Sequence, residues 1–294
     1  MRYRYYILGR LLSLVYSLHL LSDKTFLTLM HRLRMGYWVD WDNPKNFSEK
    51  LQWLKLHDRR AEYTVLVDKV KVKDWVAEKI GAEYLIPTLG VWDSPEDVDF
   101  ASLPSKFVIK CNHSSGDNYI HNDGSLPDRR KIVKILNRGY KRYGNYFYHN
   151  GEWAYRSVRK RILAEAFITN DGSNLSDYKF FCFNGEPKIV ALHKDRFTNH
   201  VRTFYDADWH KLPFRSKHPS SVTPDEKPKN FERMMELARR LSAGIPYVRV
   251  DLYNVDGKIY FGEMTLYPMG GFMPFEPAEW NRTLGDMIDL SSVK

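Results

Sequence analysis

Two apolar segments that close over one tight turn decide the fold of this chain. Residues 248–253 are Val-Arg-Val-Asp-Leu-Tyr, residues 254–258 are Asn-Val-Asp-Gly-Lys, and residues 259–265 are Ile-Tyr-Phe-Gly-Glu-Met-Thr. Apolar and polar residues alternate on both sides of the Asp-Gly pair, which predicts a β-hairpin. Each strand carries one acid near its middle, Asp251 and Glu263. An acid in an apolar strand is costly unless it is paired or binds a cation.

The register of this hairpin decides whether the two acids meet. A two-residue loop pairs Leu252 with Phe261 and places the acids on opposite faces of the sheet. A three-residue loop with a bulge closes Val255 on Ile259 and pairs the acids with each other. We favour the second register because it forms a shared carboxylate site, which suits magnesium carrying a nucleotide phosphate. The alternative is a surface hairpin whose polar face happens to include two acids and an arginine.

The composition indicates a folded globular chain with an anionic partner. Of 294 residues, 28% are charged and 43% are hydrophobic, and the length allows one large domain or two lobes. The net charge of +9 implies nucleic acid, acidic lipid, polyphosphate or acidic polysaccharide. No nucleic-acid-binding signature appears, so nucleic acid is not the expected partner. Cys111 and Cys182 lie in apolar runs without CxxC spacing, which indicates reduced core residues in a reducing compartment.

The N-terminal region is apolar but does not match a targeting or spanning segment. Arg10 falls inside the apolar run of residues 5–21, and Gly9 and His19 interrupt it. The run is too short and too interrupted for a spanning helix, and no small-residue cleavage site follows it. We interpret it as a helix that packs on the protein or makes membrane-surface contact, and we favour packing.

The order of periodic segments predicts an α+β fold with mainly antiparallel sheets. Polar turns, among them Asn184-Gly185, separate the segments, and neither repeats nor low-complexity tracts occur. The predicted helices cover about 49–56, 63–80, 129–138 and 231–241, and the predicted strands cover 107–111, 162–168, 178–183 and 188–192.

Two charged residues interrupt apolar runs upstream of the hairpin. Lys110 ends a strand just before a small-residue loop at 114–116, where a lysine fixes a phosphate while backbone N–H groups approach it. The loop is not a Walker A motif, because GxxxxGK[ST] is absent. Glu165 sits within the run 162–168, where it either serves a nucleotide or pairs with an arginine of residues 156–161.

Taken in order, these features resemble the ATP-grasp fold, which includes D-alanine–D-alanine ligase and glutathione synthetase. Several runs resemble its TupA-like branch, named for teichuronopeptide biosynthesis, and the similarity covers roughly residues 43–290. The matching runs are Asn43-Pro44-Lys45, Glu49-Lys50-Leu51, Asp68-Lys69, residues 107–110, residues 177–180, residues 248–253 and residues 261–265.

The resemblance implies two α+β lobes, with mainly antiparallel sheets, that clamp a nucleotide and follow N-terminal helices. It divides the chain into an N-terminal helical segment (1–60), a pre-ATP-grasp region (61–105), a small lobe (106–168) and a large lobe with the metal and catalytic hairpin (169–294). The implied nucleotide-binding residues are Lys73 and Lys110 at the α- and β-phosphates, Ser114, Ser115 and Gly116 in a mobile loop over the γ-phosphate, Glu165 with the backbone of Ala166 and Ile168 at the adenine, and Asp177 at the ribose.

The resemblance also implies a metal and catalytic centre on the hairpin. Asp251 and Glu263 would bind two magnesium ions, and Arg249 would stabilise an oxyanion. Many family members carry Asn two residues after the second acid, whereas this chain has Thr265, whose hydroxyl is a weaker ligand. Between the two halves, basic residues would either grip an acidic substrate or form a solvated loop; they are Lys194, Arg196 and Arg202.

The predicted function is therefore an ATP- and Mg²⁺-dependent carboxylate–amine ligase that works through an acyl phosphate and forms an amide. The branch resemblance predicts that it joins an amino acid or another amine to an acidic saccharide or uronic acid of a capsule or other cell-surface polysaccharide, or of its precursor. The predicted location is the cytoplasm, at the inner face of the membrane. The main alternative is a glycosyltransferase in surface polysaccharide synthesis. A non-catalytic binder and a kinase-like enzyme are further alternatives.

Overall fold

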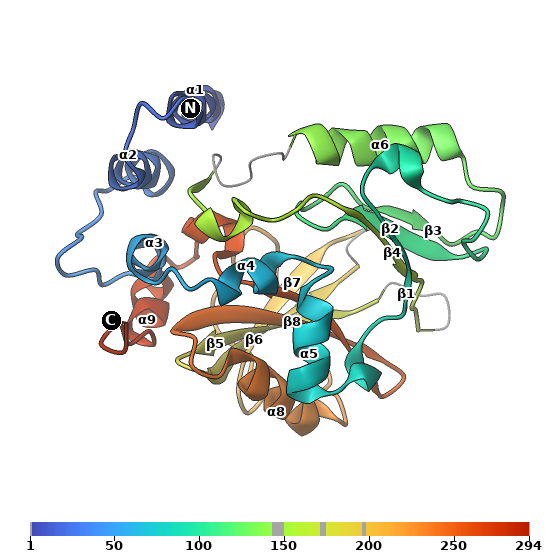
Figure 1. Ribbon diagram of the computed structural model, residues 1–294. Helices are drawn as coiled ribbons and strands as arrows, with labels where there is room; N and C mark the ends of the chain where they lie inside the picture. Colours follow the sequence, from blue (N-terminus) through green and yellow to red (C-terminus); the bar gives the residue numbers. More distant parts are fainter. Residues whose placement is uncertain (1, 143–149, 171–174, 196–197, 294) are drawn as a thin grey trace.

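Two antiparallel sheets, each covered by a helix, form the body of the molecule (Figure 1). The computed structural model describes residues 2–142, 150–170, 175–195 and 198–293. Within this part of the chain the predicted α+β fold with antiparallel sheets is confirmed. Its helices are α1 (Arg2–Ser17), α2 (Asp23–Met35), α3 (Phe47–His57), α4 (Glu62–Val67), α5 (Val72–Ile80), α6 (Arg129–Arg142), α8 (Phe231–Ser242) and α9 (Trp280–Asp286).

The small sheet has the strand order β1-β4-β2-β3. Helix α6 covers one of its faces (Figure 1), and Ile109 packs there with Ile132 and Leu136. Along β2 the buried residues alternate with half-exposed ones, so Lys110 lies on the face opposite to Ile109. Glu165 shares that opposite face, because it is paired with Val108 in the neighbouring strand. The strands are β1 (Thr88–Trp92), β2 (Phe107–Cys111), β3 (Tyr119–His121) and β4 (Ile162–Ala166).

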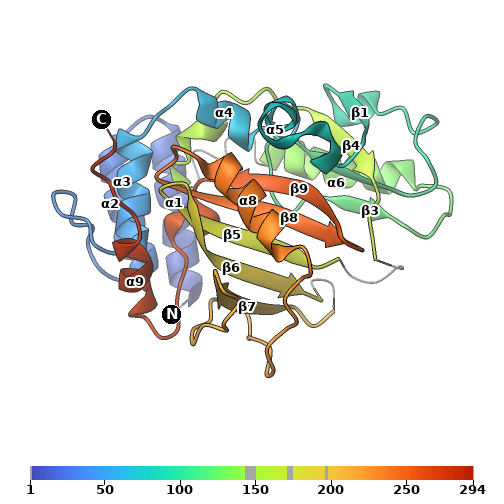
Figure 2. The same cartoon turned by 90° about the horizontal axis from the view of Figure 1, so that it is seen from below.

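The large sheet has the strand order β7-β6-β5-β8-β9, and α8 lies across one face of it (Figure 2). Phe180 stacks on Phe231 of this helix, and Cys182 is buried on the same face as a free thiol. The predicted hairpin over Asn184-Gly185 is confirmed, with φ of 52° and 85° at the turn. The strands are β5 (Asp177–Phe183), β6 (Glu186–Lys194), β7 (Val201–Asp206), β8 (Tyr247–Val255) and β9 (Lys258–Thr265).

The hairpin β8–β9 combines the two registers that the sequence allowed. Val255 pairs with Lys258, so the turn at residues 256–257 has two residues and not the three that we predicted. Asp256 and Gly257 adopt φ of 49° and 87°, a geometry that matches the twist of the flanking strands. The predicted extra residue is present, but it lies further along, at Gly262.

The bulge at Gly262 shifts the strand pairing by one residue. The side chains of β9 beyond the bulge therefore point to the opposite face from the one that an unbroken register would give them. Asp251 then pairs with Glu263, and Arg249 pairs with Thr265. The predicted pairing of the acids is therefore confirmed, although its cause is a bulge and not the turn. A glycine suits this position because a Cβ would lie only 3.1 Å from the carbonyl oxygen of Asp251.

The helix predicted over residues 63–80 is wrong, because the chain breaks there into α4 and α5. Asp68 causes the break: its carboxylate accepts a hydrogen bond from the backbone N–H of Val70 at 2.9 Å. The same carboxylate accepts from Nδ2 of Asn112 at 2.8 Å and pairs with Arg161 at 3.1 Å, which ties the break to the small lobe. Lys69 therefore lies in a turn between the two helices, where it faces both sheets.

The N-terminal helices form a layer beside the large sheet (Figure 2). Helix α3 packs against α9, and Lys50 donates to the carbonyl of Ile288 at 2.7 Å. Helices α1 and α2 pack on each other through a separate core that includes Phe26 and Met30. In the described part of the chain, no helix combines the length and the apolar character that crossing a bilayer requires. The predicted domain boundaries stay a prediction; strand β1, within residues 61–105, pairs with β4 of the small sheet.

Candidate functional site

One cluster of charges lies on the uncovered face of the small sheet. Both oxygens of the Glu165 carboxylate bind lysines: Oε1 lies 2.5 Å from Nζ of Lys73, and Oε2 pairs with Nζ of Lys110. Lys73 is held further by the carbonyl of Ile86 and the hydroxyl of Thr88, each at 2.8 Å. One carboxylate thus holds two ammonium groups side by side, and the cluster carries a net positive charge.

The titration behaviour of this cluster follows from its burial and its pairing. Burial opposes ionisation of Glu165, but Lys110 and Lys73 outweigh it and lower the pKa of that carboxyl. Burial lowers the pKa of Lys73, and the Glu165 carboxylate opposes this effect. Two ammonium groups that share one counter-ion favour the binding of an anion.

The surroundings of Glu165 differ from the sequence expectations. Its side chain contacts lysines, and not the arginines of residues 156–161 that were the alternative. The backbone N–H of Ala166 donates to the carbonyl of Pro87 at 3.0 Å, so a hydrogen bond from this residue to adenine would use its carbonyl. The adenine-binding roles of Glu165, Ala166 and Ile168 stay predictions.

A second cluster lies on the face of the large sheet that is turned away from α8. Asp251 is 1% exposed, and both of its oxygens bind Arg249, at 2.6 Å to Nε and 2.7 Å to Nη2. Lys179, directly opposite in β5, also pairs with Asp251 and lies 2.6 Å from Oδ2 of Asp177. Burial raises the pKa of Asp251, and Arg249 and Lys179 oppose this effect.

Glu263 and Thr265 complete this cluster from strand β9. Glu263 accepts from Nη2 of Arg249 at 2.9 Å, and the hydroxyl of Thr265 lies 3.2 Å from the same carboxylate oxygen. Although burial acts against it, Lys69 and Arg249 lower the pKa of Glu263 to about 2. The Glu263 side chain is 37% exposed, so it is the accessible carboxylate of the pair.

Lys69 and Lys179 are functional candidates that we did not predict. Lys69 donates to the carbonyl of Ser114 at 2.9 Å in the small lobe, and it lies 3.9 Å from Glu263 in the large lobe. The signal for Lys179 was present in the alternation of Asp177 and Lys179 along one strand face. The signal for Lys69 was the Asp-Lys pair inside a helical pattern, which marks the break.

The donor set of the second cluster fits magnesium. Asp251 and Glu263 carry four carboxylate oxygens on paired positions, and hard oxygen donors are what Mg²⁺ binds. Glu263 is the accessible one, because both oxygens of Asp251 bind Arg249 or Lys179. The cluster contains the carboxylates of Asp177, Asp251 and Glu263. Three cations balance their charge, namely Lys69, Lys179 and Arg249. Two magnesium ions and one ATP with four negative charges are together neutral, so this balance survives their binding. The number of ions and the role of Thr265 as a ligand stay predictions.

The predicted phosphate loop projects from the end of β2. Ser114 is buried, whereas Ser115 and Gly116 are exposed. Gly116 has φ of 92°, and a Cβ added there would meet no atom within 4 Å. The glycine is therefore needed for its backbone conformation, which leaves the loop tip open to a ligand.

The predicted substrate-binding residues are not gathered in one place. Arg202 in β7 lies opposite His193 in β6, on the sheet face that carries Asp177. Its Nη1 donates to the carbonyl of Ser216 at 3.1 Å. Lys194 follows on the other face, where it pairs with Asp225. Arg196 lies outside the described residues.

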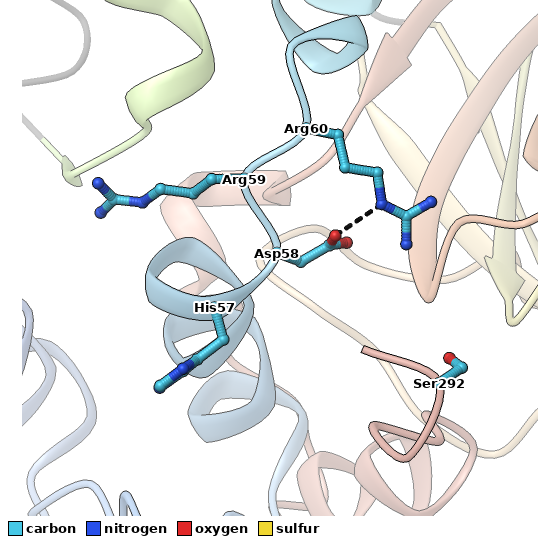
Figure 3. Close-up of a pocket in the computed structure, with 5 residues that line it drawn as sticks. All are labelled: His57, Asp58, Arg59, Arg60 and Ser292. Atoms are coloured by element: carbon cyan, nitrogen blue, oxygen red, sulfur yellow. Dashed lines mark hydrogen bonds and ion pairs between the residues drawn. The ribbon is translucent and has the colours of Figure 1, made fainter. Parts of the chain in front are cut away.

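Two other features of the described residues are separate from these clusters. A surface hollow of about 350 Å³ is lined by residues 57–60 and Ser292, but its two arginines point apart (Figure 3), and each already binds a carboxylate. Asp206, Asp208 and His210 offer ligand atoms within 4.8 Å of one another. They include an Asp-x-Asp triplet, but Asp206 already binds His210 at 3.1 Å and the backbone N–H of Asp208 at 3.0 Å.

Several solved structures are similar to this chain. D-alanine–D-alanine ligase from Bacillus anthracis, in complex with ATP, is 15% identical with a TM-score of 0.44, over 78% of this chain and 65% of that protein. The ATP-grasp ligase PsnB, with Mg and ADP, is 12% identical with a TM-score of 0.44, over 84% of this chain and 66% of that one. The ADP complex of N5-carboxyaminoimidazole ribonucleotide synthetase is 12% identical with a TM-score of 0.45, over 74% and 50%.

The chain thus spans slightly less than two thirds of the first of these ligases. A search of curated proteins found no match. Two antiparallel sheets thus each carry a cluster of lysines and acids, and Lys69 contacts residues of both lobes. The chain belongs to the TupA-like ATPgrasp family, whose sequence pattern matches residues 49–289.

Proposed function

We propose that this protein is an ATP- and Mg²⁺-dependent carboxylate–amine ligase that acts on an acidic cell-surface polysaccharide or its precursor. Membership of the TupA-like ATP-grasp family supports ATP-dependent ligation. The observation that carries the proposal is that Lys69 contacts both the small-lobe loop, at the carbonyl of Ser114, and Glu263 of the large lobe, and so links two charged clusters. Lys73 and Lys110 share one carboxylate on the small sheet, and Asp251 pairs with Glu263 on the large sheet.

In this proposal the small lobe binds the phosphates of ATP. Lys110 shares one donor with Glu165 and keeps further N–H groups for phosphate oxygens. Lys73 already uses its donors on Glu165, Ile86 and Thr88, so it would exchange one of these bonds for a phosphate oxygen. The carboxylate fixes the direction of both ammonium groups before the nucleotide arrives, which lowers the entropy lost on binding. The loop at Ser115 and Gly116 supplies backbone N–H groups at the terminal phosphate.

The large lobe supplies the metal ligands and the group that stabilises developing charge. Bound magnesium supplies neutralisation of the phosphate oxygens, which otherwise repel an attacking carboxylate. Arg249 binds Asp251, Glu263 and Thr265 through Nε and Nη2, and none of these bonds uses Nη1. Nη1 is therefore the donor that we assign to the oxyanion. The acids raise the pKa of Arg249 further, although burial opposes them, so the group stays charged throughout.

The reaction balances with ATP as the only activating reagent. The substrate carboxylate attacks the γ-phosphorus, and ADP leaves with the bonding electrons. An amine then attacks the acyl carbon, the oxyanion collapses, and inorganic phosphate departs as the amine loses a proton. The products are one amide, one ADP and one phosphate. Water would destroy the acyl phosphate, so the site must exclude it during the second step.

The net charge and the family support the proposed substrate class. The chain has a net charge of +9, and Arg202 lies on the sheet face that carries the metal-binding cluster. A uronic acid offers both a carboxylate for activation and an overall negative charge, and an amino acid offers the amine. The proposed location is the cytoplasmic face of the membrane.

Thermal unfolding with ligands tests the nucleotide site. We expect ATP with magnesium to raise the melting temperature, because a ligand that binds only the folded state stabilises it. Glu263→Gln should lose the magnesium-dependent part of this shift while it stays folded, since this side chain is 37% exposed. Glu186→Gln, which alters an exposed ion pair with Arg239, is the matched control and should behave as the wild type.

Product analysis then tests the reaction. Release of phosphate from ATP should require both a uronic acid and an amine, and mass spectrometry should detect the amide. A melting shift with UDP-sugars and none with ATP would reject the ligase and support the glycosyltransferase. A phosphorylated hydroxyl product without an amide would instead indicate a kinase.

A further inference from the structure

The first helix of the chain turns its apolar side chains toward solvent. Ile7, Leu8, Leu11, Leu14 and Leu18 are between 48% and 60% exposed. Ile7, Leu11 and Leu14 follow the spacing i, i+4 and i+7, so they line one face of α1, and Leu18 follows just after the helix ends. A helix whose only role was to pack on this protein would turn these residues inward.

The opposite face of α1 is the face that packs on the protein. Tyr16 stacks on Phe26 of α2 with ring centroids 4.0 Å apart, and it is 3% exposed. Gly9 is buried near Leu33, where an added Cβ would lie 3.5 Å away, and Ser13 satisfies its hydroxyl on the Gly9 carbonyl at 2.8 Å. Gly9 and Tyr16 thus hold the helix on α2, Ser13 is satisfied within the helix, and the leucines are left for another contact.

The charge of this region favours one kind of occupant. Residues 1–36 contain six basic side chains and one acid, which gives +5 of the net +9 of the chain. The one acid, Asp23, is paired with Arg59 at 2.5 Å. A second copy of the chain would bring two such positive segments together, whereas an anionic surface would complement them. Exposed basic residues of the two helices are Arg10, Lys24, Arg32 and Arg34.

An aromatic side chain adds the character of a lipid interface. Trp38, just after α2, is 58% exposed, and the guanidinium of Arg32 lies 5.6 Å from its ring centroid. Tryptophan rings favour the headgroup level of a bilayer, where an apolar body and a polar N–H group are both accommodated.

We propose that α1 lies in the headgroup region of an anionic lipid bilayer, with its leucine face in the acyl boundary and the basic residues of α1 and α2 on lipid headgroups. A single amphipathic helix binds weakly, and the cluster of positive charge supplies the second signal that stable anchoring needs. This inference goes beyond the proposed ligase activity and does not rest on it, because lipid binding requires neither ATP nor the acids of the hairpin.

Sedimentation with vesicles tests this proposal on the full chain. We expect the protein to sediment with vesicles that contain phosphatidylglycerol and to stay in solution with vesicles of phosphatidylcholine alone. Leu11→Asp combined with Leu14→Asp should lower the bound fraction by about tenfold or more, because both leucines leave the acyl boundary. The matched control is Leu126→Asp combined with Val222→Asp, which alters apolar residues that are 95% and 97% exposed elsewhere.

The outcomes separate a lipid surface from the other occupants. Both double variants should keep the wild-type melting temperature and its response to ATP, since all four residues are exposed. Equal sedimentation of wild type and the helix variant would overturn the proposal, and so would a wild type that ignores phosphatidylglycerol. A wild-type dimer in analytical ultracentrifugation that the helix variant abolishes would assign the leucine face to a second copy.

Discussion

Replacing Glu165 with glutamine tests how the small-lobe cluster works. The Glu165 side chain is 6% exposed, and those of Lys73 and Lys110 are 14% and 16% exposed. Breaking a buried ion pair from one side costs about 3 kcal/mol at the low end of the measured range. An unfolding entropy of about 2.1 cal/mol/K per residue amounts to about 0.6 kcal/mol/K over the chain, so the melting temperature should fall by about 5 °C.

The same variant should weaken the binding of phosphates. The variant frees Lys110, whereas Ile86 and Thr88 still hold Lys73. Ordering Lys110 again when a ligand arrives costs about 0.7 kcal/mol, which is about a threefold rise in Kd. Glu186→Gln, whose ion pair with Arg239 is about half exposed, should change the melting temperature by less than about 1 °C.

Calorimetric titration with two ligands separates the two roles open to Glu165. If it acts by orienting Lys73 and Lys110, Glu165→Gln should weaken magnesium tripolyphosphate and magnesium ATP by the same factor. If it binds adenine, only ATP should lose affinity. Unchanged binding of tripolyphosphate, together with weaker ATP binding, would refute the reasoning from the lysine pair.

Two further predictions concern the loop after β2 and the bulge in β9. Burial, with Lys160 and Lys69, lowers the pKa of His113 from 6.5 to about 4. The unfolded chain therefore binds a proton between pH 6.5 and 4 that the folded chain does not bind. The free energy of unfolding falls by about 3 kcal/mol as the pH falls through this window. Urea unfolding should show that His113→Gln removes this slope and that the exposed His210→Gln keeps it. Gly262→Ala should cost about 1–2 kcal/mol, because its Cβ would lie 3.1 Å from both the Asp251 carbonyl and the Tyr253 ring. Gly262→Ala should also reduce the rise in melting temperature with magnesium ATP. Gly9→Ala, where a Cβ meets ordinary contacts, should change neither the stability nor this rise. An unaltered rise in Gly262→Ala would show that the position of the acids does not depend on the bulge.

The sequence was sufficient for many of the elements, because local patterns decide them. The alternation around Asp256-Gly257 predicted a hairpin, and the acids in its strands predicted a polar face. The sequence was insufficient for the bulge, since a glycine inside a strand can end the strand, bend it or leave its pairing unchanged. The break at Asp68 was missed for a related reason. Its carboxylate is satisfied partly by Asn112, a residue that only the tertiary fold brings near.

The site was predictable as residue types but not as contacts. Lys110, Glu165, Asp251 and Glu263 all face the site, because strand alternation fixes their direction. Which cation meets which acid depends on how the two sheets are placed. No periodicity in the sequence carries that information, so Lys69 was overlooked although it contacts both lobes.

The bulge at Gly262 makes the position of the two acids independent of the loop that closes the hairpin. Side chains along a strand point alternately to the two faces of the sheet. The single extra residue therefore shifts this alternation by one residue, between the turn and the site. Residues 254–258 are then free to change into any other two-residue turn without moving Asp251 against Glu263. Loss of one residue between the turn and the site would have the opposite effect. It would carry Glu263 to the face that α8 covers, and a hairpin with unchanged composition would no longer hold a paired carboxylate site.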